Sequence, residues 1–463
     1  MKQRTTALLL TAALALSLLG ATALAAEGDP SAPAAAAAQT EPAAADESGP
    51  PAPAGESEAQ PAEPAGEEAE GEAAPETSDD PPAEEYIPDP VGSLSFGNLN
   101  RRMHEGNLQV LALQESIDMI EELDYDKLKE QLREQLNEIA KTQWSLVLMS
   151  KYMDGYEYHS AYDQLDSAYD AVRKQFDAIK EGDMQEDNAV TVRQLKSLQN
   201  QIIMAGEATY IALAAMELQE DGLERQLAAL DRQLTELDLR YELGHISSMT
   251  VKQARSGRAA LDSGLSTLRM NLNTYKGQLE LLIGADITGK ISLASLPAVS
   301  REEVDSMDLE QDLETAKENS WDLYDATETY KDARKEYNNH GGDYGQTYMA
   351  NDRSYQQARH TYYSAKYTYD NTVQSFELGL RNLYLKVKDY QQILDASKTA
   401  LAVEQDNYAA AQLKQSQGSL SQNKLLEAED KLKEAREKVA GAENDLFSAW
   451  NTYRWAVDYG IMN

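Results

Sequence analysis

Cysteine and histidine, the side chains that most often ligate metals or act as nucleophiles, are rare in this sequence of 463 residues. Cysteine is absent, so neither a disulfide bond nor thiol chemistry is possible. The five histidines stand at positions 104, 159, 245, 340 and 360. No two of them have a metal-ligand spacing such as i, i+4 with an acidic side chain nearby. The sequence therefore predicts no metal site.

One loop, from Asn339 to Gly345, is rich in glycine and polar groups. It could bind an ion, but a hairpin loop between helices is the simpler interpretation. The many carboxylates elsewhere are typical of solvated coiled-coil surfaces. The sequence has no Gly-x-Ser-x-Gly nucleophile elbow and no glycine-rich loop after a strand that would hold a phosphate. We therefore predict that the protein is not an enzyme and has no cofactor.

Two short segments share a spacing with a clear structural meaning. Residues 244–247 read Gly-His-Ile-Ser, and residues 418–421 read Gly-Ser-Leu-Ser. Glycine readily adopts the left-handed conformation that closes a helix. A serine hydroxyl that follows can cap the first amide groups of the next helix. Each segment therefore predicts a tight turn between two antiparallel helices.

The two turns lie at matching places in an internal repeat. Val251 and Leu425 each follow their glycine by seven residues. Each helix after a turn is expected to run to another glycine, which is Gly284 in the first copy and Gly460 in the second. Similarity at matched spacing indicates duplication of one structural unit.

Large apolar residues recur every seven positions in the second copy. The run comprises Tyr348, Tyr355, Tyr362, Tyr369, Phe376, Leu383 and Tyr390. A seven-residue apolar repeat indicates left-handed coiled-coil packing. We interpret the tyrosines as packing between helices. The alternative is a wetted surface that lines a lumen or a subunit interface, because each tyrosine hydroxyl needs water or a partner.

Proline divides the chain into two regions. Thirteen of the fourteen prolines lie from Pro30 to Pro90, and the other is Pro297. A proline inside a helix costs roughly 3 kcal/mol, so the second region favours long helices. We predict an all-α fold of two tandem repeats of long antiparallel coiled-coil helical hairpins. The first repeat covers residues 92–296 and the second covers residues 297–463.

The region before the repeats has a different character. Lys2 and Arg4, then an apolar run and the small-residue exit Ala23-Leu24-Ala25, are typical of a secretory signal peptide over residues 1–25. Residues 26–91 are rich in Ala, Pro and Glu and hold eighteen acidic residues but no Lys or Arg. We expect this acidic segment to be disordered, because it cannot bury enough apolar surface to offset its ordering entropy.

The formal net charge of the chain is -37. Such an excess of acidic groups opposes binding to nucleic acid, whose phosphates need Lys and Arg. It also opposes adhesion of the chain to anionic lipid. After the signal peptide, no uninterrupted apolar run is long enough to cross a bilayer, so we expect no membrane-spanning helix.

Residues 94–463 resemble the TolC-like outer-membrane efflux family. Each repeat of that family has a turn of the form Tyr-x-x-Gly-x-[Ile/Leu]-Ser before a helix that ends in Leu-Gly. Residues 241–247, Tyr-Glu-Leu-Gly-His-Ile-Ser, and the ending at Gly284 look very like the first copy. Residues 418–460 look like the second, in which either Tyr408 is the displaced tyrosine or Gln415 stands in the tyrosine position. At the opening of each repeat, Leu108 and Ser320 stand where the family has proline.

This resemblance implies a homotrimer that forms a tube of antiparallel helices for efflux or secretion. It implies that the turns form a periplasmic tip, which meets an adaptor protein attached to an inner-membrane pump. By matching motif, the tip residues would be Tyr241, Gly244, Ile246, Ser247, Gly418, Leu420 and Ser421. The implied location is the cell outer membrane or envelope.

The sequence departs from the family in the outward part of each repeat, where the family has the strands of an outer-membrane β-barrel. Barrel strands need about nine to eleven residues of alternating character. We find none between Trp144 and Val190 or around His340, so we expect little or no β-barrel. The alternative function is a non-channel exported coiled-coil scaffold or adhesion protein of the cell envelope, which would be cell-wall-associated or extracellular.

Overall fold

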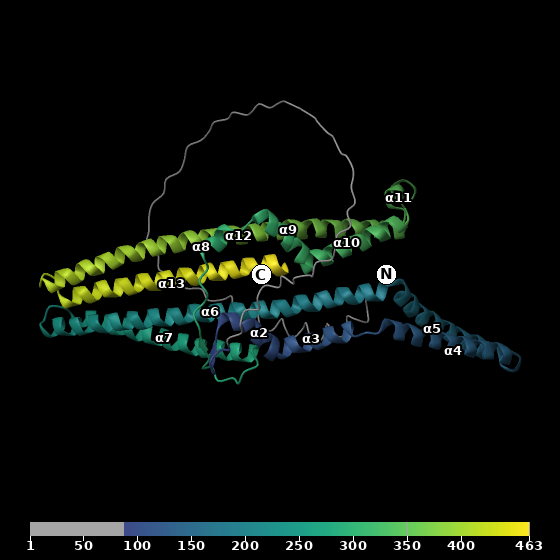
Figure 1. The fold of residues 1–463 in the computed structure, drawn as a ribbon, viewed down its shortest axis with the longest axis horizontal. Coiled ribbons are helices and arrows are strands. Elements are labelled where there is room, and N and C mark those ends of the chain that lie inside the picture. The colour runs from purple at the N-terminus through teal and green to yellow at the C-terminus, as the bar shows by residue number, and fades with distance from the viewer. Residues whose placement is uncertain (1–87, 350, 463) are drawn as a thin grey trace, which may run out of the picture. The chain divides into compact units, whose positions relative to one another are not determined.

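A computed structural model describes residues 88–349 and 351–462, and these residues are almost entirely helical (Figure 1). The predicted signal peptide and nearly all of the predicted acidic segment lie outside this part of the chain. Within it, the only strands are β1 (Ser93–Leu94) and β2 (Ser292–Leu293), which pair in parallel with Ser93 opposite Ser292. The predicted all-α fold is therefore confirmed.

The first repeat contains one long hairpin and several shorter helices. Its elements are α2 (Phe96–Gly106), α3 (Leu108–Glu121), α4 (Tyr125–Met149), the 3-10 helix η1 (Ser150–Tyr152), α5 (Gly155–Glu181), α6 (Asp183–Glu242) and α7 (Ser248–Leu282). Helices α6 and α7 form the long hairpin, and α4 and α5 form a second one (Figure 1). The core of this repeat includes Met103, Ile203 and Leu279.

The part of the chain assigned to the second repeat has a similar but shorter plan, because its described residues contain no counterpart of the α4–α5 hairpin. Its elements are α8 (Arg301–Asp305), α9 (Leu309–Asn319), α10 (Trp321–Asn339), α11 (Gly342–Tyr348), α12 (Arg353–Ser416) and α13 (Gln422–Tyr459). Helices α12 and α13 form the long hairpin, and α9 and α10 correspond to α2 and α3. A separate core includes Leu380, Leu446 and Tyr453. Pro297, which we propose as the boundary between the repeats, lies between β2 and α8.

The outward segments are helical, as the sequence predicts. Residues 144–190 form the end of α4, all of η1 and α5, and the beginning of α6. His340 ends α10, and the short helix α11 follows it before α12. None of the helices in the described ranges is both long enough and apolar enough to span a membrane.

The four long helices pack in the order α7, α6, α13, α12. Arg225 on α6 makes two hydrogen bonds of 2.7 Å with Glu437 on α13, and Arg232 pairs with Asp430 on the same two helices. Bidentate pairing of an arginine with a carboxylate fixes geometry as well as adding energy. These two ion pairs therefore set the register between the two repeats.

Within the first hairpin, cations on α7 pair with carboxylates on α6. These ion pairs are Arg255–Asp238, Arg258–Asp231, Arg269–Glu220 and Lys276–Glu217. Most of these side chains are exposed, so each pair contributes at most about 1 kcal/mol. Their main effect is to favour one antiparallel alignment of α6 and α7.

The base of each hairpin depends on a close approach of backbones. Gly284, at the end of α7, lies directly against the Gly106 backbone, and Gly460, at the end of α13, lies against Ser320. Both glycines have positive φ, 67° and 64°. At each contact an asparagine side chain adds a hydrogen bond: Asn107 donates to the Leu282 carbonyl at 2.9 Å, and Asn319 to the Val457 carbonyl at 3.1 Å.

The tyrosine repeat packs α12 against α10. Tyr362 stacks on Tyr337 with ring centroids 4.9 Å apart, and Tyr330 stacks on Tyr369 at 5.5 Å. The interpretation as packing between helices is therefore correct for these residues. Tyr348 instead lies on α11 with its side chain exposed, so the packed stripe begins with Tyr355.

We predict that replacing Gly284 with alanine destabilises the chain by about 2–4 kcal/mol. A Cβ atom there would lie 2.8 Å from the Gly106 carbonyl carbon, and the backbone is in the left-handed region. Gly257, inside α7 with nothing within 4 Å of its missing Cβ, is the matched control. There, Gly257→Ala should stabilise by about 0.5–1 kcal/mol. Urea denaturation measures both changes, and shifts of the same sign would contradict the proposed role of the glycine contact.

Candidate functional site: the paired hairpin turns

The turn between α6 and α7 is closed by backbone hydrogen bonds around Gly244. This glycine has a φ of 74°, its amide donates to the Tyr241 carbonyl at 2.9 Å, and the His245 amide donates to the Arg240 carbonyl at 2.8 Å. This pair of bonds is the Schellman motif, which satisfies the last carbonyl groups of a helix. The expected left-handed glycine is therefore present.

The turn between α12 and α13 repeats this geometry. Gly418 has a φ of 72°, its amide donates to the Gln415 carbonyl, and the Ser419 amide donates to the Lys414 carbonyl, both at 2.9 Å. Gln415, which stands in the tyrosine position of the family motif, also donates from its side chain to Gln422 across the turn at 3.3 Å.

Serine begins the helix that follows each turn. Ser247 accepts a hydrogen bond from the Thr250 amide at 3.3 Å, and Ser421 accepts one from the Lys424 amide at 3.4 Å. The serine side chains thus act as N-caps, the role that their spacing from the glycines predicts. Ile246 and Leu420 lie between glycine and serine and are half-buried.

The two turns are level with each other. Arg232 precedes Gly244 by as many positions as its partner Asp430 follows Gly418. Arg225 and Glu437 are likewise equally far along the chain from these two glycines. Because every residue of an α-helix adds the same rise along the axis, equal spacing on both sides brings the turns to the same end of the packed helices.

Several exposed apolar side chains surround the turns beyond the residues that the motif identifies. Leu243 and Met249 flank the first turn, and Leu413 precedes the second. Tyr241 is also exposed. No atom lies within 4 Å of the position that a Cβ atom would take at Gly244 or Gly418, so the space beside both glycines is open. The available sequence signal was an apolar residue within five positions of a turn glycine, and only Leu243 directly adjoins one. The turns therefore present apolar groups and open backbone rather than a catalytic arrangement.

Among the described residues, no three His, Cys, Asp or Glu side chains are grouped so that they could hold a metal ion. His245 is exposed in the first turn, and His340 contacts the carboxylate of Glu336 at 3.4 Å. The loop around Gly341 forms a turn into α11, and its glycine has a φ of 108°. These features agree with the interpretation of that loop as a connection between helices.

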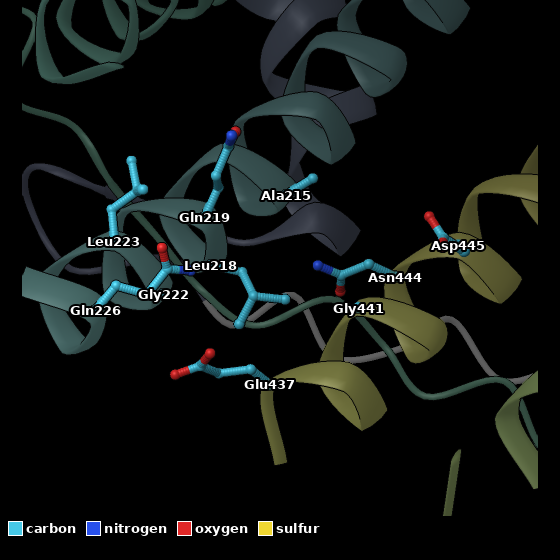
Figure 2. A pocket seen from close by; sticks show the side chains of 10 residues that line it. All are labelled: Ala215, Leu218, Gln219, Gly222, Leu223, Gln226, Glu437, Gly441, Asn444 and Asp445. Carbon is cyan, nitrogen blue, oxygen red and sulfur yellow. The ribbon is translucent and has the colours of Figure 1, made fainter. Parts of the chain in front are cut away.

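A shallow pocket of about 360 Å³ lies between α6 and α13 (Figure 2). Two helix glycines create it: the missing Cβ of Gly222 would lie 3.5 Å from Glu437, and that of Gly441 would lie 3.7 Å from Leu218. Nearby, burial raises the pKa of Asp221, and the surrounding glutamates raise it further. We interpret the pocket as a gap in helix packing.

A buried carboxylate lies at the same interface between the repeats. Glu207 on α6 is 7% exposed and accepts hydrogen bonds from Asn451 at 2.8 Å and from the Trp455 indole at 2.6 Å. Burial raises its pKa, although these two hydrogen bonds oppose the increase. Since burial disfavours the charged form of the carboxylate, we expect the packing of α6 against α13 around Glu207 to depend on pH.

Glu280 is a buried carboxylate with the opposite behaviour. It is 2% exposed and accepts hydrogen bonds from the backbone amides of residues 288–291 and from the Thr288 hydroxyl. Burial raises the pKa of Glu280, but the hydrogen bonds from Gly289, Thr288 and Lys290 together lower it below its ordinary value. The charged carboxylate thereby holds the loop after α7 in place.

We predict that Gly244→Ala and Gly418→Ala each cost about 1–2 kcal/mol, because alanine is strained at positive φ. The cost should stay local, since open space surrounds both positions. Hydrogen exchange should therefore increase for the amides of the turn and the adjoining helix ends, and the urea midpoint should fall less than for Gly284→Ala. An equal global loss would show that the turns contribute to the core.

We predict that Glu207→Gln stabilises the chain at pH 8. A carboxylate whose pKa is raised by folding contributes stability below its ordinary pKa and loses it as the pH rises through the raised value. The neutral glutamine still accepts from Asn451 and Trp455 without the cost of a buried charge, so a gain on the order of 1 kcal/mol is expected. Thermal melts from pH 5 to pH 8 measure it.

Glu280→Gln is the control, and its change in stability should have the opposite sign to that of Glu207→Gln. Its carboxylate is favoured by hydrogen bonds, so the variant should lose about 1–3 kcal/mol at neutral pH, and the loss should shrink as the pH falls. The assignment of Glu207 as a pH-sensitive group fails if Glu207→Gln shows the same pH dependence as the unaltered chain.

No family model and no curated protein matches this chain. Among solved structures, it is similar to the CmeC outer membrane channel of Campylobacter jejuni, with 14% identity, a TM-score of 0.45, and coverage of 63% of this chain and 68% of that one. The outer membrane protein VceC of Vibrio cholerae has 13% identity and a TM-score of 0.43, and the match covers 79% of this chain and 96% of that one. The MtrE outer membrane channel of Neisseria gonorrhoeae in its open state has 14% identity and a TM-score of 0.36, and the match covers 77% of this chain and 88% of that one. All three are outer-membrane proteins.

Proposed function

We propose that this protein is a component of a TolC-like efflux or secretion conduit in the outer membrane or cell envelope. In this proposal, three copies surround one tube of antiparallel helices. The observation that carries it is the pair of level, equivalent turns at one end of a row of four long helices. Two hairpins in one chain, joined side by side in a fixed register, are the repeating unit that such a tube needs.

The turns are the proposed contact with an adaptor protein attached to an inner-membrane pump. The residues assigned to this contact are Tyr241, Gly244, Ile246, Ser247, Gly418, Leu420 and Ser421. We add Leu243 to this contact, because it directly precedes Gly244 in the sequence and its side chain is exposed. Glycine and serine shape the turns, while the tyrosine and the aliphatic side chains provide the apolar surface that a helical hairpin of an adaptor would cover.

The same geometry suggests how neighbouring copies meet. Helices α7 and α12 are at the two ends of the packed row, so α12 of one copy can meet α7 of the next as α13 meets α6 within one chain. Met249 on α7 follows Gly244 by five residues, and Leu413 on α12 precedes Gly418 by five. Both side chains are 61% exposed. An assembly in the register of α6 and α13 would bury them against each other.

We predict that a chain with both Met249→Cys and Leu413→Cys forms covalent oligomers on mild oxidation. The natural chain has no cysteine, so any disulfide must join the introduced thiols. A closed ring of three should appear in denaturing gels at about three times the chain mass of 51.2 kDa. Light scattering on the unoxidised chain should give the same mass.

The matched control pairs Met249→Cys with Leu378→Cys. Leu378 is also exposed on α12 but lies far from the level of Met249, so no covalent ring is expected. If the first double variant stays monomeric and light scattering gives one chain mass, the conduit proposal fails. The chain would then be better explained as a non-channel coiled-coil scaffold or adhesion protein of the cell envelope.

A further inference from the structure

The connection between α4 and α5 exposes a concentration of large apolar side chains. We call residues 142–153, Thr-Gln-Trp-Ser-Leu-Val-Leu-Met-Ser-Lys-Tyr-Met, the α4–α5 tip. Trp144 is 65% exposed, Leu148 is 62% exposed and Tyr152 is 88% exposed. Val147 and Met149 are exposed as well. Contiguous exposed apolar groups of this size mark a surface that another molecule or a membrane covers.

The charge of the α4–α5 tip differs from that of the rest of the chain. The chain has 79 acidic and 42 basic residues, yet the tip contains no acidic residue and has one basic residue, Lys151. Lys141 precedes the tip, and the next acidic residue is Asp154, whose carboxylate caps the first turn of α5. The tip therefore lacks the carboxylates by which a phosphate-bearing surface would repel most of the remaining chain.

The distribution of apolar groups around the helix favours a surrounding medium over a single docking partner. At about 3.6 residues per turn, Trp144, Val147, Leu148 and Met149 cover about 200° of the circumference of α4. A helix that docks in a groove needs a narrower stripe of about 100°. A helix end that is apolar on most sides is instead suited to insertion among lipid acyl chains.

The residue types and the backbone also suit the boundary between lipid and water. Tryptophan and tyrosine are enriched at that boundary, and a lysine can extend its ammonium group to the phosphates. The connection satisfies its own polar groups in part, because the Ser150 hydroxyl donates to the Val147 carbonyl at 2.8 Å and Asp154 accepts from the Tyr156 amide. Fewer free polar groups lower the cost of entering the interface.

We propose that the α4–α5 tip is a membrane-contacting element that inserts Trp144, Leu148 and Tyr152 into the surface of a phospholipid bilayer. The contact is interfacial, because the apolar part of the tip is too short to span a bilayer. The inference goes beyond the proposed conduit and does not depend on the adaptor contact at the turns. Pure lipid vesicles contain no adaptor or pump, so failure of this proposal is distinguishable from failure of the conduit proposal.

The test is flotation of the purified chain, without the predicted signal peptide, with phosphatidylcholine vesicles. We expect the unaltered chain to float with the vesicles. The triple variant Trp144→Ser, Leu148→Ser, Tyr152→Ser should reduce the vesicle-bound fraction at least tenfold, because it removes the three largest exposed apolar groups. Circular dichroism must show the same helix content for both chains, since the altered side chains lie on the surface.

The matched control alters a second pair of exposed aromatic residues. Tyr344 and Tyr348 on α11 are more solvent-exposed than Trp144 and Leu148, but acidic residues Asp343 and Asp352 flank them. Tyr344→Ser with Tyr348→Ser should therefore leave flotation unchanged. If this control loses binding as strongly as the triple variant, binding depends on general surface hydrophobicity and the assignment to the tip is overturned.

Brominated lipids locate the inserted residue. Bromine in the acyl chains should quench part of the tryptophan emission of the unaltered chain, and Trp144→Phe should abolish that quenching while it still floats. The proposal is overturned if the unaltered chain does not float, if the triple variant floats equally well, or if the tip substitutions change only the oligomer mass. The last result would assign the tip to contacts between copies of this chain.

Discussion

The contact between a helix-ending glycine and the opening of the same repeat is the constraint on which the fold depends. Gly284 against Gly106 and Gly460 against Ser320 bring backbones closer than any side chain would allow. Asn107 and Asn319 then fasten each opening to the final turn of the closing helix. With its base held in this way, each long hairpin can extend far beyond its core without losing alignment. The equivalent contact at both long hairpins agrees with the predicted internal repeat.

A second constraint joins these hairpins in one register. Glu207 contacts Trp455 near the base, and Arg225 with Glu437 and Arg232 with Asp430 continue the same alignment toward the turns. The ion pairs at seven-residue spacing on both helices agree with coiled-coil packing. Because the charged pairs are partly buried and directional, a slip by one heptad would lose one of the two ion pairs and leave one carboxylate and one guanidinium group without a partner. The level turns follow from this register rather than from their own local sequence.

The sequence predicted the helices and the turn geometry because local chemistry determines both. Left-handed glycines and capping serines act within a few residues, so Gly244, Ser247, Gly418 and Ser421 could be assigned without coordinates. The departures from the family motif at Leu108 and Ser320 left the helix break intact, because Asn107 and Ser320 cap the next helix instead of a proline. The glycine contacts at the base, the pairing of α6 with α13 and the buried position of Glu207 join residues far apart in sequence. Periodicity alone does not identify such partners.

The ends of the helical segments have different chemistry, and this contrast links the fold to the proposed roles. At the paired turns, glycine and serine keep the backbone compact, and the adjoining helices have paired charges. At the α4–α5 tip, tryptophan, tyrosine and aliphatic groups replace carboxylates over twelve residues of an otherwise acidic chain. A chain with this net charge remains soluble through self-repulsion, whereas a tip that exposes large apolar groups to water has a free-energy cost. The compact turns favour recognition of another helical hairpin, whereas the tip favours lipid because apolar groups cover most of its circumference.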